Sequence, residues 1–461
     1  MMLKPYPKYK ESGEQWIGKI PQDWEVSRVK KLVDKNKYYP IGDGDHGSIT
    51  PEMYLEEGVP YIRVQNLSWQ GEILYDGMVY ISKEINLANK KSILKPNDLL
   101  IAKTGATIGK IGIIPANMPT ANTTSSVGKI TLNFEQNDVT FWKFYFQSDI
   151  FLNEIFTSAY QKSAQPGFNI DELIDFVVIH PNKEEKEKIA SFLERKTSEI
   201  NTLVEKDKQL IELIEEKRTA LINHVMTKGL NPKAMMKDSG IEWIGKVPER
   251  WEIKKIKHLA GNCSTPVQTG PFGAQLHAND YVDDGIPLIL IRNVYDQKIS
   301  SQDIPRITKE DSERLSMYKL KEGDYVFSRV GTLGRCAIIT KNEEGWLISG
   351  QMLRLRLKDI RLNLHFIGYI LQSKISEDYL SIESVGSTRE SLNTEIVMNM
   401  PFTLPPLSEQ LQIIQYLDKV TLKINKTILK IDAKIELLEE YKKSLIHHVV
   451  TGKVDVRGIA Q

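Results

Sequence analysis

Residues 12–32 read SGEQWIGKIPQDWEVSRVKKL, and residues 239–259 read SGIEWIGKVPERWEIKKIKHL. The two segments lie 227 residues apart and are identical at 11 of 21 positions. Both contain two tryptophans at the same spacing, Trp16 and Trp24 in the first and Trp243 and Trp251 in the second. Chance does not explain such agreement. We therefore interpret the chain as an internal repeat, the feature that decides its fold.

The repeat extends along the whole chain. Gly58-Val59-Pro60 and Gly285-Ile286-Pro287 keep the offset of 227, whereas the LKPND turn at 94–98 and the LKEGD turn at 320–324 lie 226 apart. From Asn169 and Asn393 onward the offset is 224. A drift of three residues indicates small loop insertions and deletions within one shared fold. The period is too long for a solenoid, so it predicts the tandem duplication of a whole module.

The first part of each module has the pattern of an α+β globule. Short apolar runs such as 59–64 and 98–102 are bounded by Gly, Pro, Asn and Asp, which is typical of short strands joined by turns. Helical segments are expected around 140–156 and 364–380. We expect one such globule in residues 1–180 and another in residues 229–404.

The second part of each module is a long helix. Residues 184–227 and 407–451 contain neither Gly nor Pro. Residues 183–228 hold ten Lys and Arg and ten Asp and Glu, a mixture that solvates the outer faces of a helix. Steps of four and three residues predict a coiled-coil seam. The expected seam is Ile189, Leu193, Lys196, Ile200, Leu203, Asp207, Leu210, Ile214, Lys217 and Leu221, with Ile413, Leu417, Val420, Ile424, Thr427, Ile431, Lys434, Leu438, Tyr441 and Leu445.

Two packing arrangements fit these helices. Each helix could pack on its own globule, or the two helices could pack on each other. The second is favoured because both carry the same stripe. Each helix of about 40 residues is roughly 60 Å long. If the two globules lie at opposite ends of the pair, the helices run antiparallel and the molecule has a pseudo-two-fold axis.

Composition excludes several classes of protein. The 461 residues are 41% hydrophobic and 26% charged, which is ordinary for a globular chain and unlike a disordered or collagen-like one. The net charge of +1 does not favour a protein that coats nucleic acid through bulk charge. Only Cys263 and Cys336 are present, so we expect no disulfide framework and no cysteine-based zinc site. Without a secretory signal or a spanning apolar run, we expect a cytoplasmic protein with no membrane contact.

These features together resemble the specificity subunit of a type I restriction–modification system. The resemblance covers essentially the whole chain. It depends on the paired W-I-G-K-[IV]-P-x-x-W-E segments, on the Gly-[IV]-Pro runs ending in Asn66 and Asn293, on TGPFGAQL at 269–276, and on PPLSEQ at 405–410. Such subunits carry two target recognition domains that alternate with two conserved helical regions.

The resemblance implies a division of the chain and a role for each part. Residues 1–180 correspond to a first target recognition domain, 181–228 to a central helical spacer, 229–404 to a second recognition domain, and 405–461 to a distal helical spacer and tail. Each recognition domain is expected to read one half of an asymmetric, bipartite site in double-stranded DNA. The helices are expected to set the spacing and, with the W-I-G-K segments, to dock the modification subunits.

The same resemblance implies which partners do the chemistry. The chain itself is expected to bind no cofactor and to catalyse nothing. Two modification subunits would bind S-adenosylmethionine and methylate adenine. Two restriction subunits, which are motor-nucleases using ATP and Mg, would cut unmodified DNA.

Candidate DNA contacts come from residue type and position. Arg and Lys suit guanine, and Asn and Gln suit adenine, because these side chains pair with the base edges in the major groove. Side chains of this kind, with small polar neighbours, lie at expected strand ends and loops of both copies. The candidates are Arg63, Gln65, Asn66, Lys103, Thr104, Gln161, Lys162, Ser163 and Gln165 in the first, and Arg292, Asn293, Tyr295, Ser328, Arg329, Thr332, Ser387, Thr388 and Arg389 in the second.

No motif predicts catalysis or a metal site. The run 105–110, GATIGK, has the wrong spacing for a phosphate-binding loop, and Ile111 stands where that loop carries a hydroxyl, so a tight turn is favoured. The E-R-K triplet at 194–196 lies inside the expected coiled coil. His447 and His448 suit a helix C-terminus better than a metal site.

Two function classes stay open on the residues alone. One is a DNA-reading protein that organises other subunits, and the other is a coiled-coil spacer with two protein-binding heads. A neighbouring gene for an adenine methyltransferase would favour the first. Residues 1–180 hold 19 Lys and Arg against 21 Asp and Glu. Because phosphate neutralisation supplies much of DNA affinity, we expect tight binding to need the partner subunits.

Overall fold

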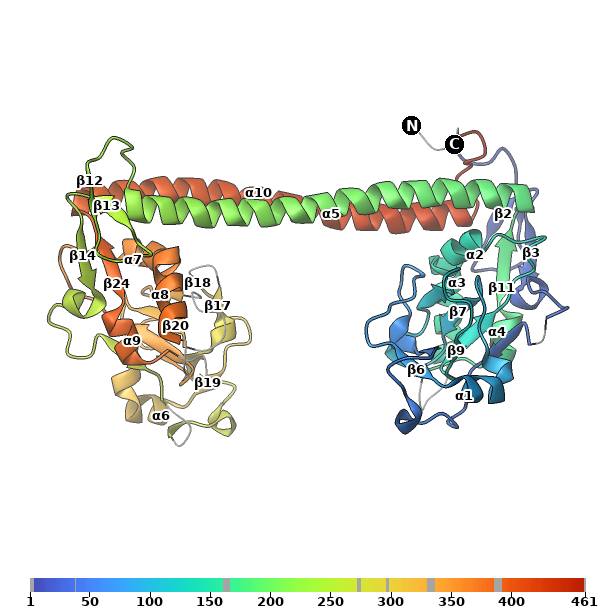
Figure 1. The fold of residues 1–461 in the computed structure, drawn as a ribbon, viewed down its shortest axis with the longest axis horizontal. Coiled ribbons are helices and arrows are strands. Elements are labelled where there is room, and N and C mark those ends of the chain that lie inside the picture. The colour runs from blue at the N-terminus through green and yellow to red at the C-terminus, as the bar shows by residue number, and fades with distance from the viewer. Residues whose placement is uncertain are drawn as a thin grey trace. The chain divides into compact units, whose positions relative to one another are not determined.

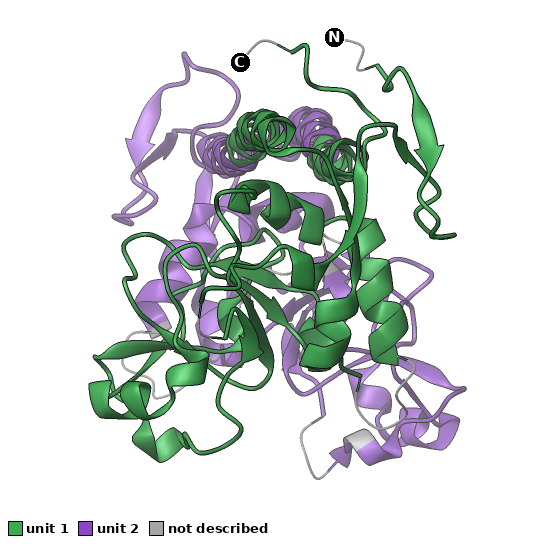
Figure 2. Ribbon diagram, turned by 90° about the vertical axis from the view of Figure 1, so that its right-hand side faces the viewer, with its two compact units in different colours: residues 1–207, 433–461 green, residues 208–432 purple. Residues whose placement is uncertain are grey.

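The computed structural model describes residues 4–37, 39–160, 166–271, 275–295, 298–329, 336–384 and 392–459. The chain forms two compact units (Figure 2). Unit 1 consists of residues 1–207 and 433–461, and unit 2 of residues 208–432. Each unit therefore contains one globule and parts of both long helices.

Unit 1 is built on a four-stranded antiparallel sheet whose central strands are completely buried. A three-stranded sheet and two strand pairs surround it, and the ends of the chain meet where Asp455 N donates to Lys4 O at 2.8 Å. The main sheet has the order β4 (Ile41–Asp43), β10 (Val127–Ile130), β7 (Leu99–Ala102), β8 (Ile111–Ile113). The others are β6 (Val79–Ile81), β5 (Val59–Ile62) and β9 (Asn122–Thr123); β1 (Tyr9–Glu11) with β2 (Lys19–Pro21); and β3 (Glu25–Arg28) with β11 (Val177–His180).

Unit 2 repeats this topology and adds one strand pair, β17 with β18, which confirms the α+β duplication. Its four-stranded sheet has the order β15 (Val267–Thr269), β23 (Met352–Leu355), β20 (Tyr325–Ser328), β21 (Cys336–Ile338). The rest are β19 (Arg306–Ile307), β16 (Ile286–Ile289) and β22 (Leu347–Ile348); β12 (Met236–Asp238) with β13 (Lys246–Pro248); β14 (Glu252–Lys255) with β24 (Pro401–Leu404); and β17 (Val294–Tyr295) with β18 (Lys298–Ile299).

The helical segments expected around 140–156 and 364–380 are each two helices. They are α2 (Val139–Phe146) and α3 (Asp149–Tyr160), and α7 (Leu364–Leu371) and α8 (Lys374–Ser384). The helical segment is interrupted at a serine in both copies, Ser148 and Ser373. Ser373 Oγ donates to Ile370 O at 2.7 Å and so satisfies a carbonyl that the end of α7 leaves without a helical partner. The other short helices are α1 (Lys83–Ala88), α4 (Ile170–Asp175), α6 (Lys309–Arg314) and α9 (Thr394–Asn399).

The long helices are α5 (Lys183–Lys228) and α10 (Leu407–Val450), and they lie side by side in antiparallel directions (Figure 1). In unit 1, Lys442 Nζ donates to Asn201 Oδ1 at 3.1 Å and Lys434 Nζ to Asp207 Oδ1 at 2.9 Å. In unit 2, Arg218 NH1 donates to Asn425 Oδ1 at 3.0 Å. The Asn201 and Asn425 contacts occupy equivalent positions, 224 residues apart, so the duplication extends to the polar contacts of the coiled coil.

The expected seam is wrong at every second position after Ile200 and Ile424. Leu203 and Leu210 are 45% and 44% exposed, and the residues that follow them, Val204 and Ile211, turn inward instead. The same shift by one residue occurs at four further positions. The exposed residues are Lys217, Thr427, Lys434 and Tyr441, and the residues that turn inward in their place are Arg218, Ile428, Ile435 and Lys442. A straight helix has 3.6 residues per turn, so its contact stripe drifts away from a strict seven-residue repeat. None of the helices formed by the described residues has the length and hydropathy needed to cross a membrane.

A buried carboxyl in unit 1 makes its stability depend on pH. Burial raises the pKa of Glu154 to about 7, with a smaller contribution from nearby Glu14, whereas the Val177 amide and Arg28 act in the opposite direction. The folded state therefore keeps a proton up to about pH 7 that the unfolded chain releases near its ordinary pKa of 4.5. Unit 1 is expected to lose stability as the pH rises from 4.5 to 7.

Replacing Glu154 by glutamine should remove this dependence. The amide oxygen can still accept from Val177 N, which donates to the carboxylate at 2.8 Å, and no charge is buried at pH 8. Urea unfolding at pH 5 and pH 8 checks this, with the exposed Glu135→Gln as the control. If the free energy of unfolding changed between pH 5 and pH 8 by the same amount in wild type and in Glu154→Gln, the pH dependence could not be assigned to Glu154.

Candidate nucleic-acid interface

The first candidate cluster follows strand β5 of unit 1. The strand runs into a single 3-10 turn, η3 (Val64–Asn66). Asn66 is completely buried; its Oδ1 accepts from Arg63 N at 3.0 Å, and its Nδ2 donates to Leu74 O at 3.0 Å. Its amide is thus used inside the protein, where it closes the turn.

Arg63 and Gln65 both precede that asparagine in the chain. Arg63 NH2 donates to Gly77 O at 2.7 Å, and its guanidinium lies 5.5 Å from the centre of the Tyr54 ring. The exposed Gln65 donates to the same carbonyl through Nε2 at 3.3 Å. The structure therefore brings these two candidates together, and each retains donors for a ligand.

Unit 2 has the same turn with other side chains. In η9 (Ile291–Asn293), Asn293 Oδ1 accepts from Leu290 N at 3.1 Å, and Nδ2 donates to Gln302 O at 3.2 Å. Arg292 stands where unit 1 has Gln65, and its NH2 donates to Asp303 O at 3.2 Å. The backbone of the turn is duplicated, but the side chain that it exposes is not. Tyr295 follows in β17, and its side chain is not described.

The second candidate cluster lies at the ends of β7 and β20. Lys103 O accepts from Phe168 N at 3.1 Å in unit 1, and Arg329 O accepts from Leu392 N at 2.8 Å in unit 2. The residues that follow the two candidate loops therefore bond at equivalent places in the two folds, and Thr104 pairs with Gly167 there. Ser328 is buried. The loop candidates Gln161, Lys162, Ser163, Gln165, Thr332, Ser387, Thr388 and Arg389 lie outside the described residues.

The ammonium group of Lys103 is engaged within unit 1. It is almost completely buried, and Nζ lies 2.5 Å from Asp43 Oδ2. The other oxygen of Asp43 lies 3.1 Å from Nε2 of the exposed His46. Sequence reasoning missed both partners of this ion pair network, because Asp43 lies 60 residues from Lys103 along the chain.

A groove of about 700 Å³ lies beside this network. Asp43 and His46 line one side, and Lys90, Lys91 and Tyr39 also line it. Lys91 Nζ lies 5.0 Å from the centre of the Tyr39 ring. Lysines and an imidazole can donate hydrogen bonds to phosphates, and an aromatic ring can stack on a base. The groove therefore has the groups that a nucleic acid requires. The adjacent lysines were the available signal in the sequence.

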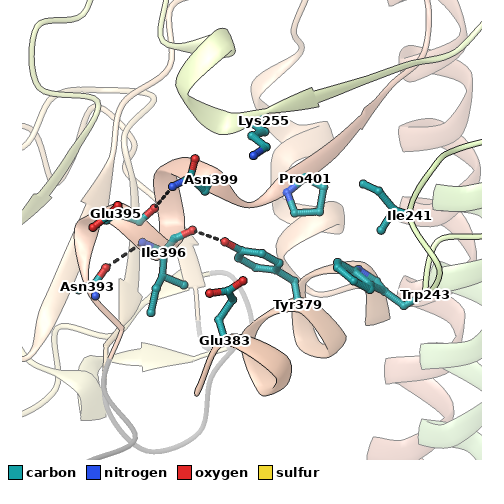
Figure 3. Close-up of a pocket in the computed structure, with 10 residues that line it drawn as sticks. All are labelled: Ile241, Trp243, Lys255, Tyr379, Glu383, Asn393, Glu395, Ile396, Asn399 and Pro401. Atoms are coloured by element: carbon teal, nitrogen blue, oxygen red, sulfur yellow. Dashed lines mark hydrogen bonds between the residues drawn. The ribbon is translucent and has the colours of Figure 1, made fainter. Parts of the chain in front are cut away.

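A second groove, in unit 2, involves the W-I-G-K segment (Figure 3). It measures about 680 Å³, and Trp243, Ile241, Tyr379 and Pro401 form its apolar lining. Figure 3 shows Tyr379, whose hydroxyl donates to Ile396 O at 3.0 Å, beside the indole of Trp243. The tryptophan of the repeated motif thus shapes a surface feature in unit 2.

The described residues contain no group of three or more His, Cys, Asp or Glu side chains that could hold a metal ion. The 105–110 run is a turn, as expected: η5 (Gly105–Thr107) is a single 3-10 turn, with Gly105 at φ +77° and Gly109 at φ +88°. Such backbone angles favour glycine. The equivalent run 331–335 lies outside the described residues.

Comparison with protein families gives one match for each copy of the repeat. The family described as type I restriction modification DNA specificity domain matches residues 21–213 and 248–437. The MjaVIII specificity subunit of a type I restriction enzyme from Methanocaldococcus jannaschii is 24% identical over 452 residues, covering 96% of this chain and 95% of that protein. The EcoBI specificity subunit from Escherichia coli is 26% identical over 176 residues, covering 38% of this chain and 35% of that one.

Solved structures share the fold. A chain from a structure of the assembly and conformational transition of the type I R-M system aligns with a TM-score of 0.67 at 15% identity, covering 94% of this chain and 99% of that one. The HsdS subunit from Thermoanaerobacter tengcongensis aligns with a TM-score of 0.52, also at 15% identity, covering 94% and 98%. Both alignments extend over nearly the whole duplicated architecture.

Proposed function

Because the chain belongs to the type I restriction modification DNA specificity family, whose members are non-catalytic components that recognise DNA, we propose that it reads an asymmetric, gapped DNA site. Unit 1 reads one half-site and unit 2 the other. The observation that carries this is the duplicated turn with Asn66 or Asn293 at its centre, which exposes Gln65 in one unit and Arg292 in the other. Glutamine suits adenine and arginine suits guanine, so the same backbone turn can present side chains for two different bases.

The proposed contacts divide by burial. The exposed or partly exposed side chains of Arg63, Gln65 and Thr104 in unit 1 and of Arg292 and Arg329 in unit 2 contact DNA. The candidates whose side chains are not described keep the same proposed role: loop 161–165 in unit 1, and Tyr295, Thr332 and loop 387–389 in unit 2. Asn66, Asn293, Lys103 and Ser328 are buried, so we assign them to holding the turns and strand ends in place. Residues 1–180 and 229–404 act as the recognition domains, and 181–228 and 405–461 as helical spacers that set the distance between half-sites.

The partners supply the chemistry. Two modification subunits carry S-adenosylmethionine, and two restriction subunits use ATP and Mg. The outer faces of the long helices support docking of the modification subunits, because they expose leucines where a solvated helix carries polar residues. In unit 2 these are Leu213, Leu422 and Leu429, and in unit 1 Leu437.

Replacing Leu429 by glutamate tests this docking surface. The leucine is 67% exposed, so the change should leave the fold intact while reducing co-purification of the modification subunit at least tenfold, since a charge would have to be buried in the interface. Thr427→Glu, which adds the same charge to the other side of the helix, is the control. Equal loss in both variants, or in neither, would argue against this face.

The function itself is tested by mapping methylated adenines in cells that carry this subunit with its methyltransferase. The expected result is one asymmetric motif with a gap. A continuous palindrome would contradict two independent readers. Because residues 1–180 carry a net charge of −2, the isolated subunit should bind DNA weakly; tight, salt-resistant binding without partners would contradict that part.

A further inference from the structure

The segment 43–49 of unit 1 is a loop held rigid by its own carboxylate. The Asp45 side chain accepts hydrogen bonds from the backbone amides of Gly47, Ser48 and Ile49 at 2.9, 3.0 and 2.9 Å. Burial acts to raise the pKa of Asp45, but the hydrogen bonds from the Ser48 hydroxyl and from these amides outweigh it and lower the pKa, so Asp45 stays a carboxylate. A loop closed by three such bonds has little freedom to move, which is what precise recognition requires.

The loop is also held against the sheet by a glycine. Gly44 N donates to Thr124 O at 3.1 Å, and a Cβ on Gly44 would lie 1.9 Å from Thr123 O, so only glycine fits. In unit 2 a Cβ on Gly270 would lie 2.3 Å from Ile348 O, the equivalent carbonyl, whereas Gly270 N donates to a different partner, Met352 O, at 3.2 Å. The duplication therefore preserves the close approach of this glycine to the neighbouring strand.

The sequence that follows this glycine differs between the units. In β4, Asp43 pairs with Gly128 of β10, and in β15 Thr269 takes the equivalent position opposite Leu353. Three residues after Asp43 stands His46, whereas three residues after Thr269 the sequence has Phe272. A shared glycine followed by different side chains is the pattern expected of an element that sets specificity.

His46 is exposed and yet oriented. Its side chain is 74% exposed, and Nε2 lies 3.1 Å from Asp43 Oδ1, while Asp43 Oδ2 is held by the buried Lys103 ammonium. Because a carboxylate only accepts, Nε2 donates to Asp43, and Nδ1 is an acceptor whenever the ring carries a single proton. An acceptor fixed in this way suits the exocyclic amino group of adenine or cytosine in the major groove.

We propose that loop 43–49 is a DNA-reading element of unit 1, in which His46 contacts a base edge and Lys90 and Lys91, which line the same groove, contact phosphates. Asp43 and Lys103 are positioning residues that hold the imidazole. The inference rests on the proposed function and deepens it by adding a base contact outside the two candidate clusters.

The test maps methylated adenines in cells that carry the subunit with its methyltransferase and either His46→Ala or His46→Gln. His46→Ala should relax the preference at one base position in one half of the gapped motif, with discrimination falling about tenfold or more. The other half should not change. His46→Gln, which keeps a hydrogen-bonding group, should retain or alter the preference at that same position. The exposed His258→Ala in unit 2 is the matched control.

The positioning role has its own readout. Asp43→Ala combined with Lys103→Met removes both charges together, and should relax the same base position as His46→Ala and no other. Lys90→Ala and Lys91→Ala should leave the motif unchanged and each reduce the salt dependence of DNA binding by the assembled methyltransferase by about one counterion.

Two outcomes would overturn the inference. One is an unchanged motif in His46→Ala, and the other is a uniform loss of methylation at all sites with a normal thermal melt. Neither would affect the proposed function, which fails only if the wild-type subunit directs no methylation to a gapped motif. The two failures are therefore distinguishable in the same experiment.

Discussion

Replacing Trp24 by alanine is expected to lower the free energy of unfolding of unit 1 by about 3–5 kcal/mol. The side chain has no exposed surface. Its ring packs edge to face with Tyr6, with the ring centres 5.9 Å apart, and Nε1 donates to Glu185 Oε1 at 3.2 Å. Alanine would leave a large cavity at the junction of the globule with α5 and would remove a donor from a buried carboxylate.

Trp16 provides the control, since it belongs to the same repeated motif but is 50% exposed. Trp16→Ala should cost no more than about 1 kcal/mol. Because a chain of two units need not unfold in one step, hydrogen exchange in β3 and β11 should be measured with circular dichroism during denaturation. If Trp16→Ala and Trp24→Ala lowered the free energy of unfolding equally, burial would not explain the stabilising role of tryptophan in this motif.

The second large effect is expected in unit 2. Asp324 is 1% exposed, and Arg356 Nε donates to its Oδ1 at 2.6 Å, while Lys321 N donates to Oδ2 at 2.8 Å. Arg356→Ala would leave this carboxylate buried without its counter-charge, at a cost of about 3–5 kcal/mol. Adding Asp324→Asn should recover part of the loss, because a neutral amide requires no cation.

Arg361→Ala is the matched control. Arg361 also forms an ion pair, with Asp359 at 2.7 Å, but its side chain is 52% exposed. Water and salt screen such a pair, so its removal should cost at most about 1 kcal/mol. Hydrogen exchange in β20 and β23 distinguishes the two variants, and a similar effect of both would contradict the assigned role of burial.

The Asp324 pair shows how far a repeated sequence predicts structure. Asp98 occupies the same turn in unit 1 and is equally buried, but it accepts from Thr131 Oγ1 at 2.6 Å, and burial raises its pKa. The turn itself follows from the local sequence, since Lys95 N donates to Asp98 at 2.9 Å as Lys321 N does to Asp324. The counter-charge comes from Arg356, which follows β23 and lies 32 residues away along the chain, so the local sequence does not specify it.

The sequence locates the turns that carry candidate side chains, but it does not predict how those side chains are used within the protein. The turns around Asn66 and Asn293 were located correctly along the chain, but the asparagines close those turns from inside the protein. Lys103 was chosen as a base contact, and its ammonium pairs with Asp43. His46, which we propose as a base contact, is not marked by any periodicity or composition, because its orientation depends on Asp43 and hence on the pair with Lys103.

The sequence alone determined the duplication, the α+β character of each copy, and the position of the two long helices. These follow from repeated motifs, short-range hydrophobic patterns and the absence of Gly and Pro, all of which are properties of neighbouring residues. Tertiary structure decided which seam positions face inward after Ile200, where the helices break at Ser148 and Ser373, and which polar side chains stay available for DNA. The reason is physical. Whether a polar group is hydrogen-bonded within the protein depends on partners that lie tens of residues away, and only the folded chain brings those partners together.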